Sequence, residues 1–265
     1  MKKIFISADI EGVSGITSWE ATRFGGKGYE EACRQMAKET AAACRAALNC
    51  GYGVVVKDGH EDAMNIAHEL LPEEVELISG WACTPLSMLG GIDETFAGII
   101  YIGYHSGAWT STSPLKHTCE DYIYNWFKIN DKYASEFTIN SGVADQLGVP
   151  SLLLSGDAGI CSEAEAEYPG IVTVPTKKGI GNATWNIHPD KVVAEIEKAV
   201  TEVLSRPLPQ AKPLSQSYTM TLCYKEFQKA MTASWFPGVE KLDDFTVSYT
   251  ADSPMELARC RYFIG

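Results

Sequence analysis

Short apolar runs alternate with amphipathic helical stretches along the first two thirds of the chain. The runs are rich in Val, Ile and Leu and are bounded by Gly, Pro or charged residues, which is typical of buried strands. Strands are predicted at residues 3–8, 53–59, 75–78, 98–104, 151–157 and 171–174, and helices at 29–49, 135–147 and 188–204. This alternation predicts an α/β fold with a doubly wound, mainly parallel sheet.

The composition of the chain changes at residues 205–213, which contain three prolines. Beyond this stretch the pattern predicts strands at 218–224 and 245–249 and helices at 227–233 and 255–262. We therefore expect two domains: an α/β domain with the candidate site at residues 1–207, and a smaller α+β domain at 208–265. Within the first domain, residues 124–133 predict a β-hairpin that turns at Asn130-Asp131.

Charge and composition narrow the classes of partner. The formal net charge is −12, and no segment is rich in Lys and Arg, which argues against nucleic acid or an anionic membrane surface. No apolar run approaches the roughly 20 residues of a membrane-spanning helix. Asp9 and Glu11 interrupt the first apolar run too early for a signal peptide. The eight cysteines show no C-x-x-C spacing, so we expect free thiols and a cytoplasmic location.

Three of the predicted strands end on side chains that can bind a metal. Asp9 and Glu11 follow the first strand, His60 follows the strand at 53–59, and His105 follows the strand at 98–104. In an open parallel sheet, ligands bind beyond the carboxyl ends of the strands. If these strands are neighbours, two carboxylates and two imidazoles converge on one spot, and this composition suits a divalent cation, zinc above all.

Each of these side chains also has an ordinary structural explanation when taken alone. Asp9 and Glu11 could be solvated or helix-capping charges, His60 could be a loop histidine, and His105 could bond to backbone. Asp58, two residues before His60, could orient the imidazole ring from outside the ligand set. Only the joint occurrence of the set at strand ends favours a metal site.

Two further polar side chains follow His105 in the sequence. His117 lies on a polar loop, which fits a proton carrier better than a ligand. Glu136 follows Ser135 in the first turn of a predicted helix, where a carboxylate is stabilised by the helix dipole with or without a metal. Cys119, close to His117, lacks any local signature of a nucleophile, so a buried thiol is the better interpretation.

The ordered set of motifs resembles the D-aminopeptidase family of zinc metallopeptidases, peptidase family M55. The matching segments are Ala8-Asp9-Ile10-Glu11-Gly12-Val13-Ser14-Gly15, Asp58-Gly59-His60, Gly103-Tyr104-His105, His117 and Ser135-Glu136, in that order. The resemblance extends over most of the chain. It departs from the family in the loop at 106–113, where Trp109 could reshape the substrate pocket. It departs again at the chain end, which comes soon after Cys260.

The resemblance implies a particular chemistry. Two zinc ions would be held by Asp9, Glu11, His60, His105 and Glu136, with Asp9 as the bridging carboxylate, and His117 would be the catalytic histidine. Family members remove N-terminal residues, often D-amino acids, from short peptides and assemble into homo-oligomeric rings. We therefore expect a homo-oligomeric aminopeptidase that acts on a short peptide or amino-acid amide. His117 would move a proton to the leaving amine or attack the carbonyl directly.

Two other functions fit the same residues less well. A binuclear metal-dependent phosphoesterase would use the same ligands, but it needs cations or a glycine-rich cradle for phosphate. Lys57 and Lys116 are the only nearby cations in the sequence. A non-catalytic, metal-binding oligomer would keep the ligands without turnover.

Overall fold

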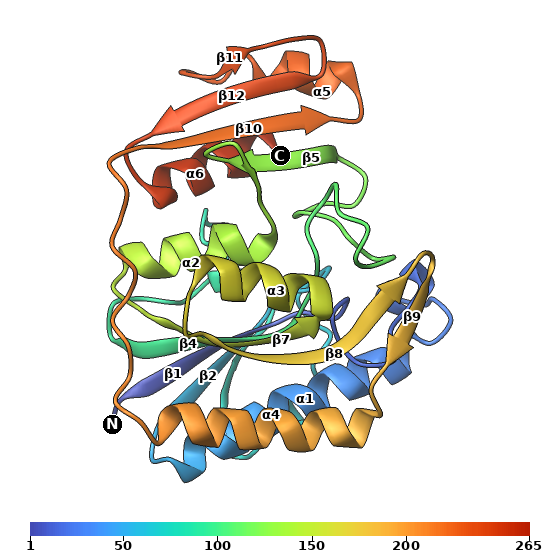
Figure 1. Ribbon diagram of the computed structural model, residues 1–265, viewed down its shortest axis with the longest axis vertical. Coiled ribbons are helices and arrows are strands. Elements are labelled where there is room, and N and C mark those ends of the chain that lie inside the picture. Colours follow the sequence, from blue (N-terminus) through green and yellow to red (C-terminus); the bar gives the residue numbers. More distant parts are fainter.

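The computed structural model describes residues 1–265 and contains two β-sheets (Figure 1). In spatial order, the strands of the larger, seven-stranded sheet are β3 (Glu76–Ile78), β2 (Gly53–Asp58), β1 (Lys3–Ala8), β4 (Phe96–Tyr104), β7 (Ser151–Asp157), β8 (Val172–Ile180) and β9 (Ala183–Asn186). All neighbours pair in parallel except β8 and β9. The predicted fold, an α/β protein with a mainly parallel sheet, is confirmed.

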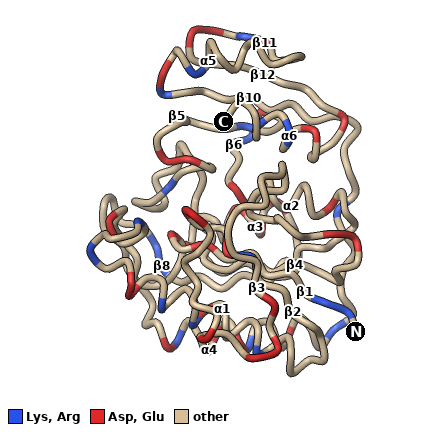
Figure 2. The backbone as a smooth tube through the Cα atoms, turned by 180° about the vertical axis from the view of Figure 1, so that it is seen from behind, with Lys and Arg blue, Asp and Glu red and all other residues tan.

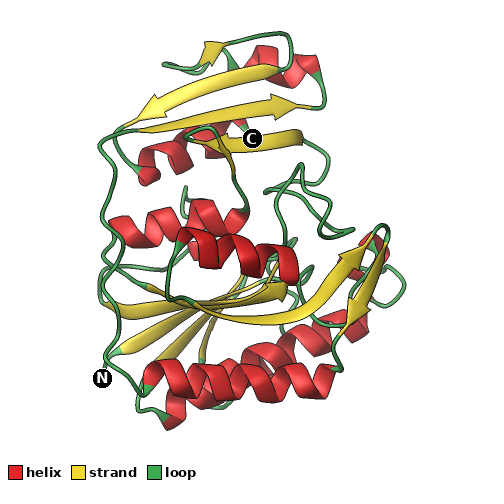
Figure 3. Cartoon of the chain, viewed as in Figure 1, coloured by secondary structure: helices red, strands yellow, loops and turns green.

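Helices cover both faces of this sheet (Figure 3). α1 (Tyr29–Asn49) and α4 (Pro189–Leu204) lie on one face, and α2 (Glu136–Gln146) and α3 (Ala158–Glu167) lie on the other. Along β1, Ile4 and Ile6 belong to the core on the first face, whereas Phe5 belongs to the core on the second. This alternation follows from the two-residue period of a strand, and it explains why β1 reads as a continuous apolar run.

The strand order reverses between β1 and β4, because the chain builds outward from β1 to β2 and β3 before crossing to β4 and β7. Such a switch point leaves a crevice beyond the carboxyl ends of the two strands. Asp9 follows β1 and His105 follows β4, so the switch point lies between the two predicted ligand segments. Short 3₁₀ helices at Trp19–Thr22 and Ser87–Leu89 belong to loops at this edge, and a third, at His68–Leu70, lies in the connection that precedes β3.

The smaller sheet contains five strands. Their order is β11 (Glu240–Lys241), β12 (Thr246–Ala251), β10 (Tyr218–Tyr224), β5 (Tyr124–Ile129) and β6 (Lys132–Tyr133), with α5 (Phe227–Ala233) and α6 (Pro254–Ile264) packed on them. The hairpin β5–β6 precedes residue 207, yet it pairs with β10. The division into 1–207 and 208–265 stays a prediction, and this sheet takes strands from both ranges.

Most local elements agree with the sequence pattern. The hairpin turns at Asn130 and Asp131, both with positive φ, as a tight two-residue turn requires. Ser135 caps α2 and forms a capping box with Thr138. The strand predicted at 171–174 is longer, because β8 continues beyond Pro175 to form an antiparallel hairpin with β9 at the sheet edge.

The structure has neither a long basic segment nor a helix that could span a membrane. Acidic and basic residues alternate along the backbone without a long basic stretch (Figure 2). None of the helices is both long and apolar enough to span a membrane. The cysteines form no disulfides, and the cytoplasmic location stays a prediction.

Candidate metal centre

The ends of β1, β2 and β4 hold the candidate ligands side by side. Sheet-like hydrogen bonds continue past the strands: the Asp9 amide donates to Ile102 O at 2.8 Å, and the Gly59 amide donates to Ala8 O at 2.8 Å. The Gly12 amide likewise donates to Gly103 O at 2.7 Å. The three loops that follow these strands therefore start from one rigid edge.

Two glycines allow the loop after β1 to contact the end of β4 directly. A Cβ atom on Gly12 would lie 1.8 Å from Tyr104 O, and one on Gly103 would lie 2.1 Å from Asp9 O. Gly103 also has φ of +72°, which side-chain-bearing residues rarely adopt. This backbone contact brings Asp9 within reach of His105, and it gives a physical reason for the glycine in the Asp9-Ile10-Glu11-Gly12 motif.

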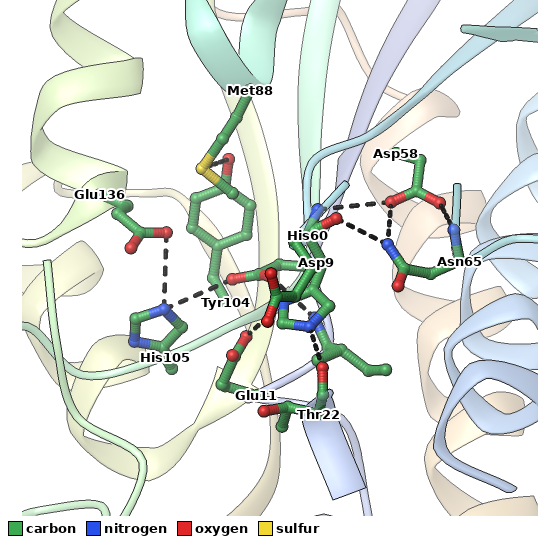
Figure 4. Close-up of polar contacts among 12 residues, drawn as sticks. Asp9, Glu11, Thr22, Asp58, His60, Asn65, Met88, Tyr104, His105 and Glu136 are labelled. Carbon is green, nitrogen blue, oxygen red and sulfur yellow. Dashed lines mark hydrogen bonds and ion pairs between the residues drawn. The ribbon is translucent and has the colours of Figure 1, made fainter. Parts of the chain in front are cut away.

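Asp9 lies between two imidazole rings (Figure 4). His60 Nδ1 is 3.4 Å from Asp9 Oδ1 and 3.2 Å from Glu11 Oε2. On the other side, His105 Nε2 is 3.4 Å from Asp9 Oδ2 and 3.4 Å from Glu136 Oε2. Each oxygen of the Asp9 carboxylate thus faces a different histidine, so two adjacent groups of ligand atoms share this one side chain.

Backbone carbonyls orient the three histidine rings. His60 Nε2 donates to Thr22 O at 2.5 Å, His105 Nδ1 to Ser106 O at 3.0 Å, and His117 Nδ1 to Leu115 O at 3.0 Å. In the neutral rings, the second nitrogen is then left with a lone pair that faces the carboxylates. A lone pair and an anion repel each other unless a cation lies between them.

Asp58 does not orient the His60 ring, contrary to the sequence-based expectation. Its carboxylate accepts hydrogen bonds from the amides of Asn65 at 2.6 Å and Ile66 at 2.8 Å, and from Asn65 Nδ2 at 2.9 Å. Asp58 therefore holds the loop at 58–66 in shape, while Thr22 supplies the contact to the ring. Backbone carbonyls such as that of Thr22 leave no signature in a sequence.

The centre contains buried polar atoms without hydrogen-bond partners. Asp9 Oδ2, Glu11 Oε2 and His105 Nε2 are all buried and unpartnered. Such atoms are costly unless a bound group satisfies them. Potential ligand atoms lie within 4.8 Å of one another in two sets, Asp9–Glu11–His105 and His105–His117–Glu136. Carboxylate oxygens and imidazole nitrogens in this arrangement fit zinc.

The pKa values of the carboxylates differ sharply. Burial, together with the charge of Glu11, raises the pKa of Asp9 to about 8. Burial opposes ionisation of Glu136 as well, but the charge and hydrogen bond of His105 outweigh it and lower the pKa of Glu136 to about 2. A divalent cation beside Asp9 would remove the reason for its raised pKa, because it would stabilise the ionised form.

His117 differs from the other two histidines. Its ring stacks on His105 with centroids 4.1 Å apart and packs edge-on against Trp19. Burial and the charge of His105 lower the pKa of His117, whereas nearby carboxylates outweigh burial and raise the pKa of His60 and of His105. His117 Nε2 lies 3.5 Å from Glu136 Oε1, and the residue lines the cavity. A neutral imidazole in this position can accept a proton.

A buried lysine and a buried glutamate support the loop that carries the first two acidic residues. Lys177 Nζ donates to the backbone carbonyls of Glu11, Val13 and Ile16, and Glu39 Oε1 accepts from the Ser14 amide at 3.1 Å. Neither residue was predicted from the sequence to belong to the site. The position of Glu39 on the apolar face of the 29–49 helix was an available signal, whereas the charge of Lys177 gave no sign of burial.

Replacing Glu39 with glutamine is expected to stabilise the chain in a pH-dependent manner. Burial raises the pKa of Glu39 from 4.5 to about 7. Ionised Glu39 therefore costs nothing below pH 4.5, and its cost grows up to pH 7 and then levels off. The stabilisation of Glu39→Gln should reach at most roughly 3 kcal/mol above pH 7.

Thermal melting of the metal-loaded chain between pH 4.5 and 8 measures this difference. Glu30→Gln, at an exposed position of the same helix, should show no such trend. Parallel melting curves for Glu39→Gln and the unmodified chain would contradict the assignment.

A cavity of about 700 Å³ opens over the cluster. Its walls come from loops of the larger sheet, including Trp19 and Trp81, and from α2 and α6, including Ile139 and Arg261. Trp109 does not line this cavity. Its side chain is exposed and stacks on Tyr133, so the expectation that Trp109 reshapes the pocket is wrong.

Asp9, Glu11, His60, His105, Glu136 and His117 are thus all brought into one cluster by the structure. Their roles as ligands and as a catalytic group stay predictions. An open α/β sheet with buried carboxylates and imidazoles at its switch point has the architecture expected of a metal-dependent hydrolase.

Comparison with known proteins identifies the family. The model of the peptidase M55 family, described as D-aminopeptidase, matches residues 1–262. A D-aminopeptidase of Bacillus subtilis (strain 168) is 29% identical over 258 residues, which cover 96% of this chain and 93% of that protein. The chain therefore belongs to the M55 D-aminopeptidase family, as the resemblance predicted, and is a peptidase of the hydrolase class.

A solved structure supports the same conclusion. The Zn-dependent D-aminopeptidase DppA from Bacillus subtilis, described as a self-compartmentalizing protease, has a TM-score of 0.92 with this chain at 28% identity. The match covers 99% of this chain and 96% of that structure. The fold of the whole chain, including both sheets, is therefore the fold of this relative.

Proposed function

We propose that this chain is a zinc-dependent aminopeptidase that removes N-terminal residues, preferentially of D configuration, from short peptides or amino-acid amides. The observation that carries the proposal is the position of Asp9, whose two oxygens face His60 and His105 within a buried cluster of unpartnered atoms. The names of the relatives, a D-aminopeptidase and a Zn-dependent D-aminopeptidase, support the same activity.

Two zinc ions per chain fit the ligand atoms. Asp9, Glu11 and His60 would hold one ion, and Asp9, His105 and Glu136 would hold the other, with the Asp9 carboxylate shared. Three protein ligands for each ion leave positions free for substrate and water, as catalytic zinc sites require. The carbonyls of Thr22 and Ser106 would keep the two ligand rings in the right tautomer.

In this proposal, the bound ions and His117 have different roles in amide hydrolysis. When bound, the two zinc ions would polarise the scissile carbonyl and lower the pKa of a bound water. His117 Nε2 faces the same space, and it would take up the proton that the attacking water releases and pass it to the leaving amine. The Leu115 carbonyl holds His117 in the tautomer that this step needs.

The charge of the cavity favours a cationic amino terminus over a phosphate. Six acidic residues and only two arginines line it: Asp9, Glu11, Glu61, Glu120, Asp121 and Glu136, with Arg23 and Arg261. Lys57 and Lys116 do not line it, and Lys57 donates instead to backbone carbonyls. Neither of the two lysines considered for a phosphoesterase therefore faces the cavity.

We extend the proposal to quaternary structure. The solved relative is described as self-compartmentalizing, and a homo-oligomer, ring-shaped as the family resemblance implies, is the assembly that we propose for this chain.

Metal analysis combined with a substrate panel tests the proposed function. Protein purified without added metal should contain about two zinc ions per chain and hydrolyse D-Ala-D-Ala faster than L-Ala-L-Ala. A chelator should abolish the activity, and zinc should restore it. Hydrolysis of p-nitrophenyl phosphate without peptide hydrolysis would favour the phosphoesterase, and bound zinc without either activity would favour a non-catalytic metal-binding oligomer.

A further inference from the structure

One cationic side chain in the cavity has a buried N–H group without a hydrogen-bond partner. Of the two arginines that line the cavity, Arg23 is engaged: it forms an ion pair with Asp121 at 2.7 Å and lies over the ring of Trp19. Arg261, on α6, differs, because its buried Nε has no hydrogen-bond partner. Arg259 on the same helix again has a partner, Glu256, at 2.7 Å.

A guanidinium with a buried donor left unpaired at the wall of a cavity favours the binding of an anion. Arginine remains charged at any physiological pH, and its planar fork of N–H donors matches the two oxygens of a carboxylate. Leaving such a group without an acceptor is costly in a partly buried position. Arg261 also borders a second cavity of about 420 Å³. Glu163 is one of the acidic residues that line this second cavity, and it already accepts hydrogen bonds from Ser135 and Thr138.

Arg261 lies close to the metal centre, with Cys119 between them. The Cys119 amide donates to Glu136 Oε1 at 2.7 Å. Burial raises the pKa of the Cys119 thiol to about 12 against the opposing charge of Arg261, which places the guanidinium beside this residue. Glu136 and Arg261 thus both neighbour Cys119 and line the same cavity.

A dipeptide suits this arrangement of the ligand cluster and the guanidinium in one cavity. Its scissile carbonyl would lie at the metal centre, and its free carboxylate would lie one residue further, roughly 3.5 Å along an extended chain. In a longer peptide or an amide, a neutral amide group replaces that carboxylate. Among substrates with the same N-terminal residue, only the one with the free carboxylate would complete the partner set of Arg261.

We propose that Arg261 binds the C-terminal carboxylate of the substrate and so selects dipeptides with a free carboxyl end. This inference rests on the proposed aminopeptidase function. The interaction is a charge-assisted, bidentate hydrogen bond made to the part of the substrate that leaves, so it acts mainly on binding, and its loss should appear mainly in KM.

The test compares D-Ala-D-Ala with D-Ala-D-Ala amide as substrates of the zinc-loaded enzyme. The unmodified enzyme should favour the free carboxylate in kcat/KM by on the order of 10- to 100-fold. Arg261→Met should remove this preference through a raised KM for the dipeptide and leave the amide unchanged. Arg261→Lys should retain part of the preference, and Arg259→Met, at the exposed neighbour on α6, should retain all of it.

The outcomes separate this inference from the proposed function. Equal kcat/KM values for the two substrates in the unmodified enzyme would overturn the role of Arg261, even if Arg261→Met does not fold. An equal loss on both substrates in Arg261→Met would also overturn it, because a residue that merely supports Glu136 would act on both. Absence of hydrolysis of either substrate by the unmodified enzyme would overturn the proposed function, and this inference with it.

Discussion

Replacement of His117 by alanine is expected to leave the fold and the zinc content of the chain unchanged and to lower kcat by on the order of 10²- to 10⁴-fold. The reason is the position of its ring. His117 stacks on His105 and lines the cavity, and Nδ1 is held by Leu115 O while Nε2 has no backbone partner. The lowered pKa of His117, caused by burial and the charge of His105, favours the neutral ring that accepts a proton.

Zinc content and steady-state kinetics on D-Ala-D-Ala, measured on the same preparation, check this expectation. His188→Ala, which removes an exposed histidine at the start of α4, should leave kcat unaltered. An unchanged kcat in His117→Ala would remove His117 from the chemistry. Loss of one zinc ion per chain would instead make His117 a ligand, which its position in the His105–His117–Glu136 set allows.

Replacement of Asp9 by asparagine is expected to remove both zinc ions and reduce hydrolysis to background. Asp9 is the only carboxylate that contacts both His60 and His105, so its neutralisation weakens both sites at once. Glu136→Gln, the matched change at a carboxylate that contacts His105 and His117 but not His60, should affect mainly one ion. Retention of two zinc ions in Asp9→Asn would contradict the bridging role.

Stability without metal provides a second readout for the same variant. Burial, together with the charge of Glu11, raises the pKa of Asp9 from 3.8 to about 8. In the metal-free chain, Asp9 therefore destabilises the fold increasingly as the pH rises from about 4 to 8. Metal-free Asp9→Asn should melt higher than the metal-free unmodified chain at pH 8, and the order should reverse once zinc is added.

Helices and strands could be predicted because the spacing of apolar residues in the sequence differs between the two. The 29–49 helix and the 218–224 strand have the predicted bounds, since apolar spacing defines such elements without reference to the rest of the chain. The convergence of Asp9, His60 and His105 could be predicted too. It follows from a general property of parallel sheets, in which strand ends meet at one edge.

Contacts between segments that are distant in the sequence could not be predicted from the pattern of apolar and polar residues. Nothing in the hairpin at 124–133 indicates that it pairs with β10, because any exposed strand edge offers the same backbone donors and acceptors. The carbonyl of Thr22 that orients His60 and the burial of Lys177 depend on segments brought together only by folding. The continuation of β8 beyond Pro175 was not predicted, since proline usually argues against a strand.

The route of the β5–β6 hairpin has a consequence for biosynthesis. The chain leaves the larger sheet after His105, contributes two strands to the smaller sheet, and returns at Glu136. The hairpin pairs with β10, and β10 leaves the ribosome long after His105 and Glu136. We therefore expect nascent chains to acquire the second ion only after translation of Tyr218–Tyr224, so that maturation of the centre is post-translational.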